Sequence, residues 1–216
     1  MDSWEYLFDR AMEALDSVDR SLLPKPQWTF GGGTALMLTY RHRISRDIDI
    51  FLDRPEWLTV LSPRLNDVTD GFCVDYVEDT RFLKLSLSEG EIDFIVAPLL
   101  THPGAVVGEL RGRNIAVETP VEIVAKKLRY RGTRLRSRDV IDLAMVCSSL
   151  ADSRNLARFA ELWAPQLPAI LGHLESMRAH FSEEVAGLAL LPSGERLRAN
   201  ALQIAIDFLS RPNKVY

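Results

Sequence analysis

Two aspartates stand one residue apart within an apolar run, and this spacing suits a divalent-cation site. They are Asp47 and Asp49 in the segment RDIDIFLD. Side chains alternate along a β-strand, so both carboxylates lie on one face with their Cα atoms about 6.7 Å apart. Carboxylates at this spacing can share one cation or bracket two, and Mg²⁺ prefers such hard oxygen ligands. Because carboxylates are rarely buried without a partner, the alternative is a solvent-exposed strand face.

A third carboxylate repeats this pattern further along the chain. Asp93 interrupts the apolar segment EIDFIV as Asp47 and Asp49 interrupt theirs. If the strands that carry the two motifs are neighbours in a sheet, the three carboxylates converge. The sequence therefore predicts a magnesium site, for one ion or two, formed by Asp47, Asp49 and Asp93.

A glycine-rich turn stands before the first of these motifs. The segment GGGTAL follows a short predicted strand and opens a predicted helix. Glycine permits positive φ and close approach of the backbone, and a helix start offers unpaired N–H groups at its positive end. This combination is typical of a phosphate cradle, although it is not a P-loop because no Gly-Lys-Ser/Thr follows. The residues expected to contact phosphate here are Gly32, Gly33 and Thr34.

Positive charge gathers in one later segment. The net charge is −4, yet residues 126–138, KKLRYRGTRLRSR, hold seven basic residues and no acidic one. A flexible lysine such as Lys127 suits a triphosphate as a point charge, whereas arginines such as Arg134 and Arg138 grip phosphates through a rigid fork. This distribution favours a polyanionic substrate.

Two aspartates follow the basic segment. Asp139 and Asp142 are three residues apart, so they share one face of a predicted helix. The alternative to a binding role is a surface network in which Arg134 and Arg138 pair with these two carboxylates. Such a network could also orient Lys127.

The hydrophobic pattern predicts an α+β fold. Residues 1–20 place apolar side chains at helical spacing, and residues 34–42 predict a second helix. Thr119, Pro120 and Glu122 indicate a helix start, with threonine as the N-cap and proline at the first helical position. Only helices are expected after it. The predicted strands are rich in β-branched and aromatic residues and cover 27–30, 46–53, 71–79, 81–88, 91–98 and 113–119.

We therefore expect two domains, a mixed α/β half over residues 1–118 and an all-helical half over residues 119–216. With 216 residues, 47% of them hydrophobic and 26% charged, the composition is that of a soluble globular protein with a sizeable core. No apolar run approaches the ~20 residues of a membrane span, and the acidic N-terminus lacks the features of a signal peptide. A cytoplasmic protein is expected.

Together, these motifs resemble the DNA polymerase β-like nucleotidyltransferase superfamily, in which a Gly-Gly or Gly-Ser pair precedes an Asp-x-Asp strand. Thirteen residues separate Gly33 from Asp47. More narrowly, the chain resembles the AbiEii/AbiGii toxin family over roughly residues 29 to 145. The matching motifs are GGTAL at 32–36, R-x-S-x-D-I-D at 43–49, I-D at 92–93 and K-L…R…R-D-x-x-D-L at 127–143.

The resemblance implies a polymerase β-like core, a mixed sheet with flanking helices, followed by a helical half that completes the active-site cleft. It also implies a magnesium-dependent enzyme that transfers a nucleoside monophosphate from an NTP to an acceptor and releases pyrophosphate. By the same resemblance the acceptor is RNA, with tRNA 3′ ends as the leading candidate. The biological role would be that of a toxin whose antitoxin is a separate protein chain.

In this interpretation Asp47 and Asp49 hold the cations, while Asp93 completes the second metal site and helps activate the attacking hydroxyl. Lys127 balances charge on the leaving pyrophosphate. The expected nucleotide-binding residues are Gly32, Gly33, Thr34, Ser45, Lys127, Arg134, Arg138 and Asp142.

Three other functions share part of this pattern. A small-molecule nucleotidyltransferase of the antibiotic-modifying type would share the acidic site, but a cationic acceptor would require an acidic pocket. A metal-dependent nuclease could use three aspartates, yet it has no need of GGGTAL or of Lys127. A non-catalytic nucleotide-binding descendant would retain the fold alone.

The chain departs from the family pattern at two positions. Family members usually carry apolar residues just after the lysine, whereas Arg129 and Arg131 stand there in this sequence. If these side chains face the cleft, they would strengthen binding to a nucleic-acid backbone. If they face solvent, they add only solubility.

Overall fold

The computed structural model describes residues 3–18 and 26–211. Its residues pack into two compact units, and each unit is described by itself. Unit 1 comprises Met1–Ala35, Ser45–Pro98 and Ala105–Glu118. Unit 2 comprises Leu36–Ile44, Leu99–Gly104 and Thr119–Tyr216. The helical unit therefore includes two short segments that precede Thr119 in the sequence.

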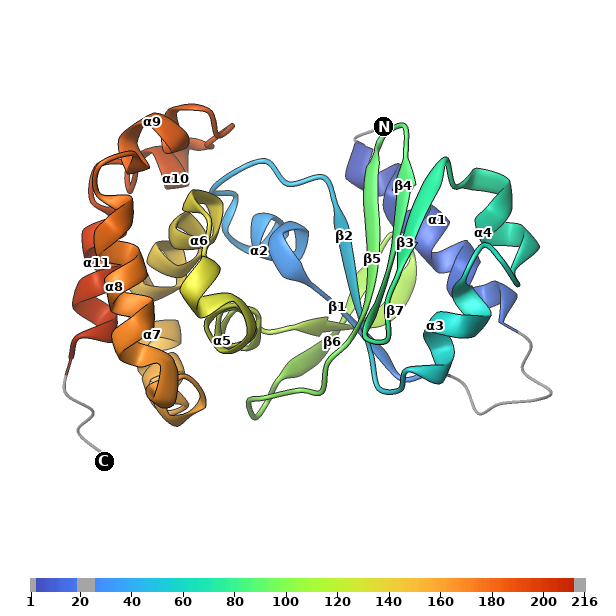
Figure 1. The fold of residues 1–216 in the computed structure, drawn as a ribbon, viewed down its shortest axis with the longest axis horizontal. Coiled ribbons are helices and arrows are strands. Elements are labelled where there is room, and N and C mark those ends of the chain that lie inside the picture. The colour runs from blue at the N-terminus through green and yellow to red at the C-terminus, as the bar shows by residue number, and fades with distance from the viewer. Residues whose placement is uncertain (1–2, 19–25, 212–216) are drawn as a thin grey trace. The chain divides into compact units, whose positions relative to one another are not determined.

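Unit 1 is built around a mixed sheet (Figure 1). Within the described residues it has seven strands in the order β3-β4-β5-β2-β1-β7-β6. Strands β2 and β5 run parallel, as do β1 and β7, and the other neighbours are antiparallel. The strands are β1 (Trp28–Gly31), β2 (Ile48–Leu52), β3 (Asp75–Glu78), β4 (Phe82–Leu87), β5 (Gly90–Val96), β6 (Ala105–Leu110) and β7 (Arg113–Glu118).

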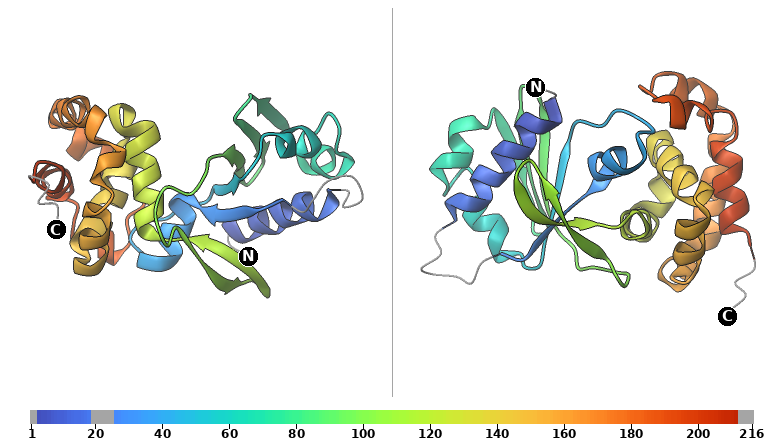
Figure 2. Two further views of the ribbon diagram at one scale, coloured as in Figure 1. Left: turned by 90° about the horizontal axis from the view of Figure 1, so that it is seen from below. Right: turned by 180° about the vertical axis from the view of Figure 1, so that it is seen from behind.

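One face of this sheet forms the core of unit 1. The alternating residues of β2, β4 and β5 are buried on that face, whereas the residues between them are partly exposed on the other. Helix α1 (Ser3–Ser17) covers the apolar face over β2 and β5, as Figure 2 shows from behind. The buried strand side chains are Ile48, Ile50, Leu52, Leu83, Leu85, Leu87, Ile92 and Phe94.

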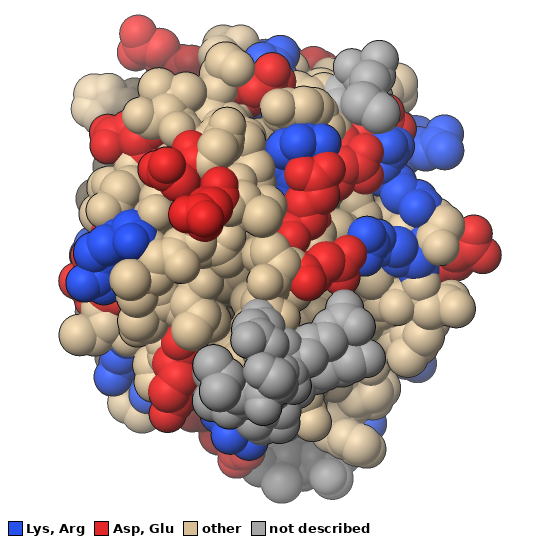
Figure 3. Space-filling view, turned by 90° about the vertical axis from the view of Figure 1, so that its right-hand side faces the viewer, with Lys and Arg blue, Asp and Glu red and all other residues tan. Residues whose placement is uncertain are grey.

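Two shorter helices complete unit 1. Helix α3 (Glu56–Leu61) contacts β4, and α4 (Asp67–Phe72) contacts α1. The face of unit 1 in Figure 3 carries acidic and basic side chains next to one another. Arg64, for example, donates to Glu78 at 3.2 Å.

Most predicted elements of unit 1 are confirmed. The first helix is α1, although positions 1–2 and 19–20 of its predicted span lie outside the described residues. The second helix is α2 (Gly32–Tyr40), which begins two residues earlier than predicted, directly at the glycines. The strands β1, β2, β4, β5 and β7 lie within their predicted spans or extend them by one residue.

Two expectations about strands were wrong. The segment 71–79 was predicted as one strand, but its first two residues end α4 and β3 begins only at Asp75. The sequence analysis also missed β6, which forms a hairpin with β7 through Arg111 and Gly112. Both turn residues have positive φ, 49° and 73°, as a tight hairpin requires. Every residue of β3 is exposed, and β6 has no buried residue, so neither strand shows a buried alternation.

Unit 2 is helical in its described part, as predicted for the second half of the chain (Figure 1). Helix α6 packs against α5, α7 and α11, and α8 packs against α11. No described helix is long and apolar enough to span a bilayer. The α-helices that follow Thr119 are α5 (Pro120–Arg131), α6 (Ser137–Ser148), α7 (Leu150–Ala157), α8 (Leu167–Met177), α9 (Phe181–Ala186), α10 (Pro192–Glu195) and α11 (Ala201–Leu209).

The predicted helix start at Thr119 is confirmed, but the Glu122 side chain binds a neighbouring segment and not the start of its own helix. Thr119 Oγ1 accepts from the Glu122 backbone N–H at 3.2 Å, as an N-cap should. The fully buried Glu122 carboxylate instead accepts from the backbone N–H groups of Leu100 and Thr101 at 2.8–3.1 Å and from the Thr101 hydroxyl at 2.7 Å. Glu122 therefore fastens the 99–104 segment to α5.

Candidate active site

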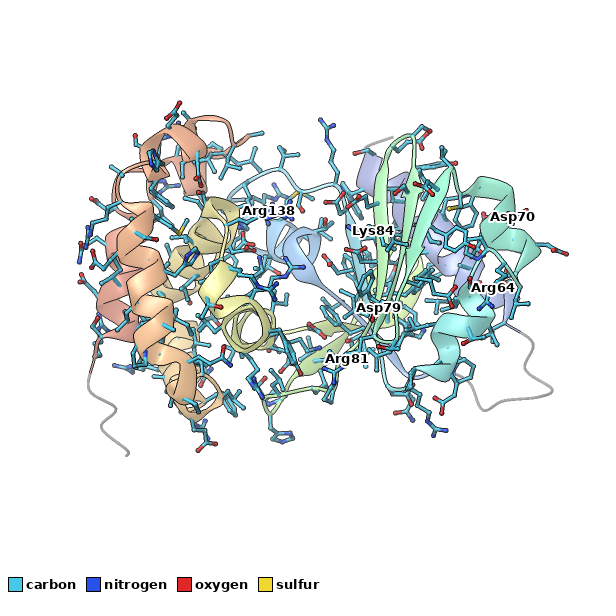
Figure 4. All side chains as sticks on the ribbon, viewed as in Figure 1. Arg64, Asp70, Asp79, Arg81, Lys84 and Arg138 are labelled. Atoms are coloured by element: carbon cyan, nitrogen blue, oxygen red, sulfur yellow. The ribbon has the colours of Figure 1, made fainter. Side chains whose placement is uncertain are left out.

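A row of charged side chains crosses the sheet of unit 1 on the face opposite its core. Asp49 of β2 lies directly beside Asp93 of β5 in the parallel register. On the far side of Asp93, the antiparallel register places Lys84 of β4 (labelled in Figure 4). On the far side of Asp49 lies Gly31 of β1. The expected neighbourhood of the two acidic strands is therefore confirmed.

The environment of Asp93 disfavours its charge. Burial of the side chain, followed by the nearby charge of Asp49, raises the pKa of Asp93 to about 6. Its Oδ1 atom is buried, lacks a hydrogen-bond partner, and lies 3.4 Å from Lys84 Nζ. That ammonium group donates a shorter bond, 2.6 Å, to Glu91. Lys84 therefore compensates only part of the negative charge around Asp93.

Asp47 is positioned by backbone contacts just before β2 begins. Its Oδ1 atom accepts from the Glu91 backbone N–H at 3.3 Å. Its carbonyl oxygen accepts from the buried Thr34 hydroxyl at 2.5 Å. Thr34 thus ties the first turn of α2 to the residue that leads into the acidic strand.

Gly31, the last residue of β1, and Gly32, the first residue of α2, leave space for two carboxylates. Gly32 has φ +69°, and a Cβ there would lie 1.8 Å from Asp49 Oδ2. A Cβ at Gly31 would lie 2.5 Å from Glu118 Oε2, whose carboxylate accepts from the Thr29 hydroxyl at 2.8 Å. The Asp49 carboxylate therefore lies against the first residue of α2, at the positive end of this helix.

The residues present fit a divalent cation in part. Asp49 and Asp93 supply neighbouring hard oxygen donors, and one of them, the buried Oδ1 of Asp93, accepts no hydrogen bond. In the described part of the chain, no three His, Cys, Asp or Glu side chains are grouped closely enough to hold a metal ion. Two protein carboxylates could therefore bind Mg²⁺. Water and phosphate oxygens would fill its other coordination positions, as is usual for this ion.

A second cluster of charges lies within unit 2. Lys127 of α5 donates to Asp139 at 2.6 Å and to Asp142 at 2.5 Å, both on α6. Burial is the largest influence and opposes ionisation of Asp139, but the Lys127 charge and the hydrogen bonds from Lys127 and the Arg136 backbone together lower the pKa of Asp139 below its ordinary value. The Lys127 side chain retains 12% of its surface exposed. Its amine is therefore fixed by two carboxylates without being sealed from a ligand.

Arg43 and His42 complete this cluster, and sequence reasoning assigned neither of them a role. Arg43 donates to both oxygens of Asp142 at 2.7 and 2.8 Å, and His42 Nε2 lies 2.7 Å from the same carboxylate. Despite its complete burial, Asp142 has a pKa held well below its ordinary value, because Lys127 and Arg43 supply opposing charge and hydrogen bonds. The only sequence signal was the position of Arg43 within the R-x-S-x-D-I-D motif.

The remaining predicted nucleotide-binding residues are more open. Arg134 is exposed, and Arg138 is partly exposed in the first turn of α6 (Figure 4). Ser45 is partly exposed in the segment before Asp47. The alternative network of Arg134 and Arg138 with the α6 carboxylates was wrong, because Lys127, Arg43 and His42 take those positions.

Comparisons with known proteins give one family match and two similar solved structures. Residues 18–198 match the family of the nucleotidyl transferase AbiEii toxin of type IV toxin–antitoxin systems. The solution structure of the antibiotic-resistance factor ANT(2'')-Ia is similar over 83% of this chain and 100% of that one, with 16% identity and a TM-score of 0.52, which shows a shared fold. The crystal structure of TM1012 from Thermotoga maritima aligns with 55% of this chain and 80% of its own, with 17% identity and a TM-score of 0.35. No curated protein matches the chain.

The raised pKa of Asp93 predicts a pH-dependent stability difference in metal-free protein. The folded state binds the Asp93 proton more tightly than the unfolded chain, so stability falls as pH rises from about 4 through about 6. A pKa rise from 3.8 to about 6 corresponds to roughly 3 kcal/mol. Relative to wild type, Asp93→Asn should gain about that much stability between pH 4 and pH 7.5 when unfolding is measured in urea with EDTA.

Asp70→Asn, at an exposed position on α4 (Figure 4), is the matched control and should show no such gain. A stability difference between wild type and Asp93→Asn that does not change with pH would contradict the described environment of this carboxylate.

The unit 2 cluster predicts a large cost for neutralising Asp142. Asp142→Asn leaves two buried or nearly buried cations, Arg43 and Lys127, without their shared anion. Breaking a buried pair in this way costs about 3–5 kcal/mol. Urea unfolding at pH 7 should show that loss, whereas Asp207→Asn on the exposed side of α11 should stay within about 0.5 kcal/mol of wild type. Equal stability of the two variants would refute the cluster.

Proposed function

The chain belongs to the AbiEii family of nucleotidyltransferase toxins of type IV toxin–antitoxin systems, and on that premise we propose that it transfers a nucleoside monophosphate from an NTP to RNA with Mg²⁺. The tRNA 3′ end is the preferred acceptor in this proposal. The reaction would release pyrophosphate and take place in the cytoplasm, where NTPs and tRNA occur. A separate antitoxin chain would oppose its effect.

The single observation that carries the proposal is the in-register pair of Asp49 and Asp93 beside the start of α2. Two carboxylates side by side repel one another unless a cation lies near both. The first turn of a helix, in turn, favours phosphate through its free N–H groups and positive dipole end. A metal–triphosphate complex satisfies both features at once.

In this proposal the unit 1 carboxylates bind the metal ion, and one of them also helps activate the acceptor hydroxyl. Bound Mg²⁺ would neutralise the phosphates of the NTP. Asp49 and Asp93 would hold it, and Asp47 would join them only through a change of its side-chain position on binding. Asp93 would also help activate the attacking hydroxyl, because its carboxylate lies beside Asp49 at the proposed cation site. Gly32, Gly33 and Thr34 would receive the triphosphate through backbone N–H groups, with Ser45 as a further phosphate contact.

Unit 2 would supply the positive charge. Lys127 would balance charge on the leaving pyrophosphate, while Asp139 and Asp142 position its amine. Arg134 and Arg138 would grip further phosphate oxygens through their guanidinium groups. Because Asp142 is fully buried, its part in nucleotide binding would be indirect, through Lys127 and Arg43.

Transfer of radiolabel tests the proposal directly. The protein is incubated with each α-labelled NTP, Mg²⁺ and total bacterial RNA, and label is expected in a tRNA-sized band. Asp49→Asn and Lys127→Met should each lower the rate on the order of 100-fold or more, because each removes charge that stabilises the transition state. Asp79→Asn, in an exposed position beside the β3–β4 turn (Figure 4), is the matched control and should retain the wild-type rate.

The alternatives give different results in the same assay. Label that enters only a small molecule would support an acceptor of the antibiotic type. RNA that is shortened without any NTP requirement would support a nuclease. Binding of NTP without transfer to any acceptor would leave a non-catalytic descendant, and each of these three results would contradict the proposed reaction.

A further inference from the structure

Five arginines lie within ten residues at the junction of α5 and α6, and we call residues 129–138 the arginine segment. Four of them are exposed and the fifth is partly exposed. None of the five forms an ion pair with any other described residue. They come from the last turn of α5, from the 3₁₀ turn Gly132–Arg134 and from the start of α6. They are Arg129, Arg131, Arg134, Arg136 and Arg138.

This clustering contrasts with many arginines elsewhere on the chain. Arg64 pairs with Glu78, Arg178 with Glu175, and Arg198 with Glu195. The chain has 30 acidic residues against 26 lysines and arginines, so acidic partners are plentiful. The arginine segment therefore concentrates positive charge that no ion pair with a described residue neutralises, as expected of a surface that meets a polyanion.

A structural role accounts for only part of the segment. Arg129 and Arg131 lie in the last turn of α5, where cations favour the negative end of the helix. That effect falls off within the last turn and does not extend to Arg134 or Arg136. The exposed arginines beyond the helix end therefore need another explanation.

Tyr130 adds a flat ring to the segment. Its side chain is 43% exposed, and the Arg129 guanidinium lies 5.9 Å from the ring centroid. An exposed aromatic ring among arginines is the combination with which proteins bind single-stranded nucleic acid, since the ring stacks on a base while the cations follow the backbone.

The position of this ring relates the segment to the proposed reaction. Tyr130 and Arg131 stand three and four residues after Lys127 on α5, so they lie on the same side of that helix. A strand bound along the segment would therefore end one helical turn from the amine assigned to the pyrophosphate. One NTP has too few phosphates to occupy five arginines spread over three elements, whereas a polynucleotide offers a phosphate at every residue.

From these observations we infer that the arginine segment binds the single-stranded 3′ end of the acceptor RNA, with Arg129, Arg131 and Arg136 on its phosphates and Tyr130 stacked on a base. This inference rests on the proposed RNA acceptor. It adds the surface that holds this acceptor, and it places Arg129 and Arg131 in a binding role.

The test is equilibrium binding without NTP, so that no transfer occurs. Fluorescence anisotropy follows a labelled single-stranded RNA with a free 3′-hydroxyl over a series of salt concentrations. The combined variant Arg129→Gln/Arg131→Gln/Arg136→Gln should weaken binding at least about tenfold and lower the slope of log K against log salt by about 2, at roughly 0.7 per phosphate contact. Unfolding in urea checks that the variant is folded.

The matched control changes three exposed arginines that have acidic partners. Arg64→Gln/Arg178→Gln/Arg198→Gln removes the same charge and should change neither the affinity nor the salt slope by a comparable amount. Tyr130→Ala should weaken binding roughly 5- to 100-fold with an unchanged salt slope, because stacking involves no phosphate. Tyr130→Phe, which keeps the ring, should bind as wild type does.

Failure of this inference and failure of the proposed function are distinguishable. If the wild type labels RNA but the arginine-segment variant binds it as tightly as wild type, the surface is wrong and the reaction stands. If the variant loses binding but no NTP ever labels RNA, the surface stands and the reaction is wrong. Displacement of the RNA by poly-L-glutamate at equal charge, together with wild-type RNA affinity in Tyr130→Ala, would instead indicate an acidic protein as the ligand and would overturn the inference.

Discussion

The parallel pairing of β2 with β5 holds two carboxylates, Asp49 and Asp93, side by side, and the rest of the proposed site depends on this constraint. The register that joins Asp49 to Asp93 also joins Ile48 to Ile92 and Ile50 to Phe94 on the opposite face, where all four side chains are fully buried. A slip of one residue would place carboxylates in the core and apolar side chains outside it. Hydrophobic burial on one face thus enforces an electrostatically unfavourable pair on the other.

The charges of unit 2 follow the opposite principle. There, the buried Asp142 carboxylate accepts hydrogen bonds from Arg43 and Lys127 and lies beside the His42 ring. Such a network limits the movement of its members, so that Lys127 presents its charge from a fixed position. Among the described residues, unit 1 thus holds a carboxylate pair whose charge Lys84 offsets only in part, and unit 2 holds a lysine whose position is fixed by two carboxylates.

The sequence predicted correctly those strands and helix starts that depend on local residue patterns. Apolar alternation predicted β2, β4 and β5, and the threonine–proline pair at 119–120 predicted the start of α5. The convergence of Asp49 and Asp93 followed once their two strands were taken to be neighbours.

What sequence reasoning missed depends on pairing between distant segments. In the sequence, Lys84 is simply a polar residue of a strand in which polar and apolar residues alternate. Only the register of β4 with β5 places it beside Asp93. His42 and Arg43 lie about 100 residues from Asp142, so no local pattern connects them. Strand β6 was missed because none of its residues is buried, which leaves no buried alternation to detect.

Binding of Mn²⁺, used as a calorimetric substitute for Mg²⁺ together with a non-hydrolysable NTP analogue, tests the central claim most directly. The account predicts that Asp49→Asn and Asp93→Asn each weaken Mn²⁺ binding by about tenfold or more. It also predicts that the double variant loses less than the two single losses combined, because both carboxylates serve the same ion. Wild-type affinity for Mn²⁺ in both single variants would contradict the claim that this strand pair forms a cation site.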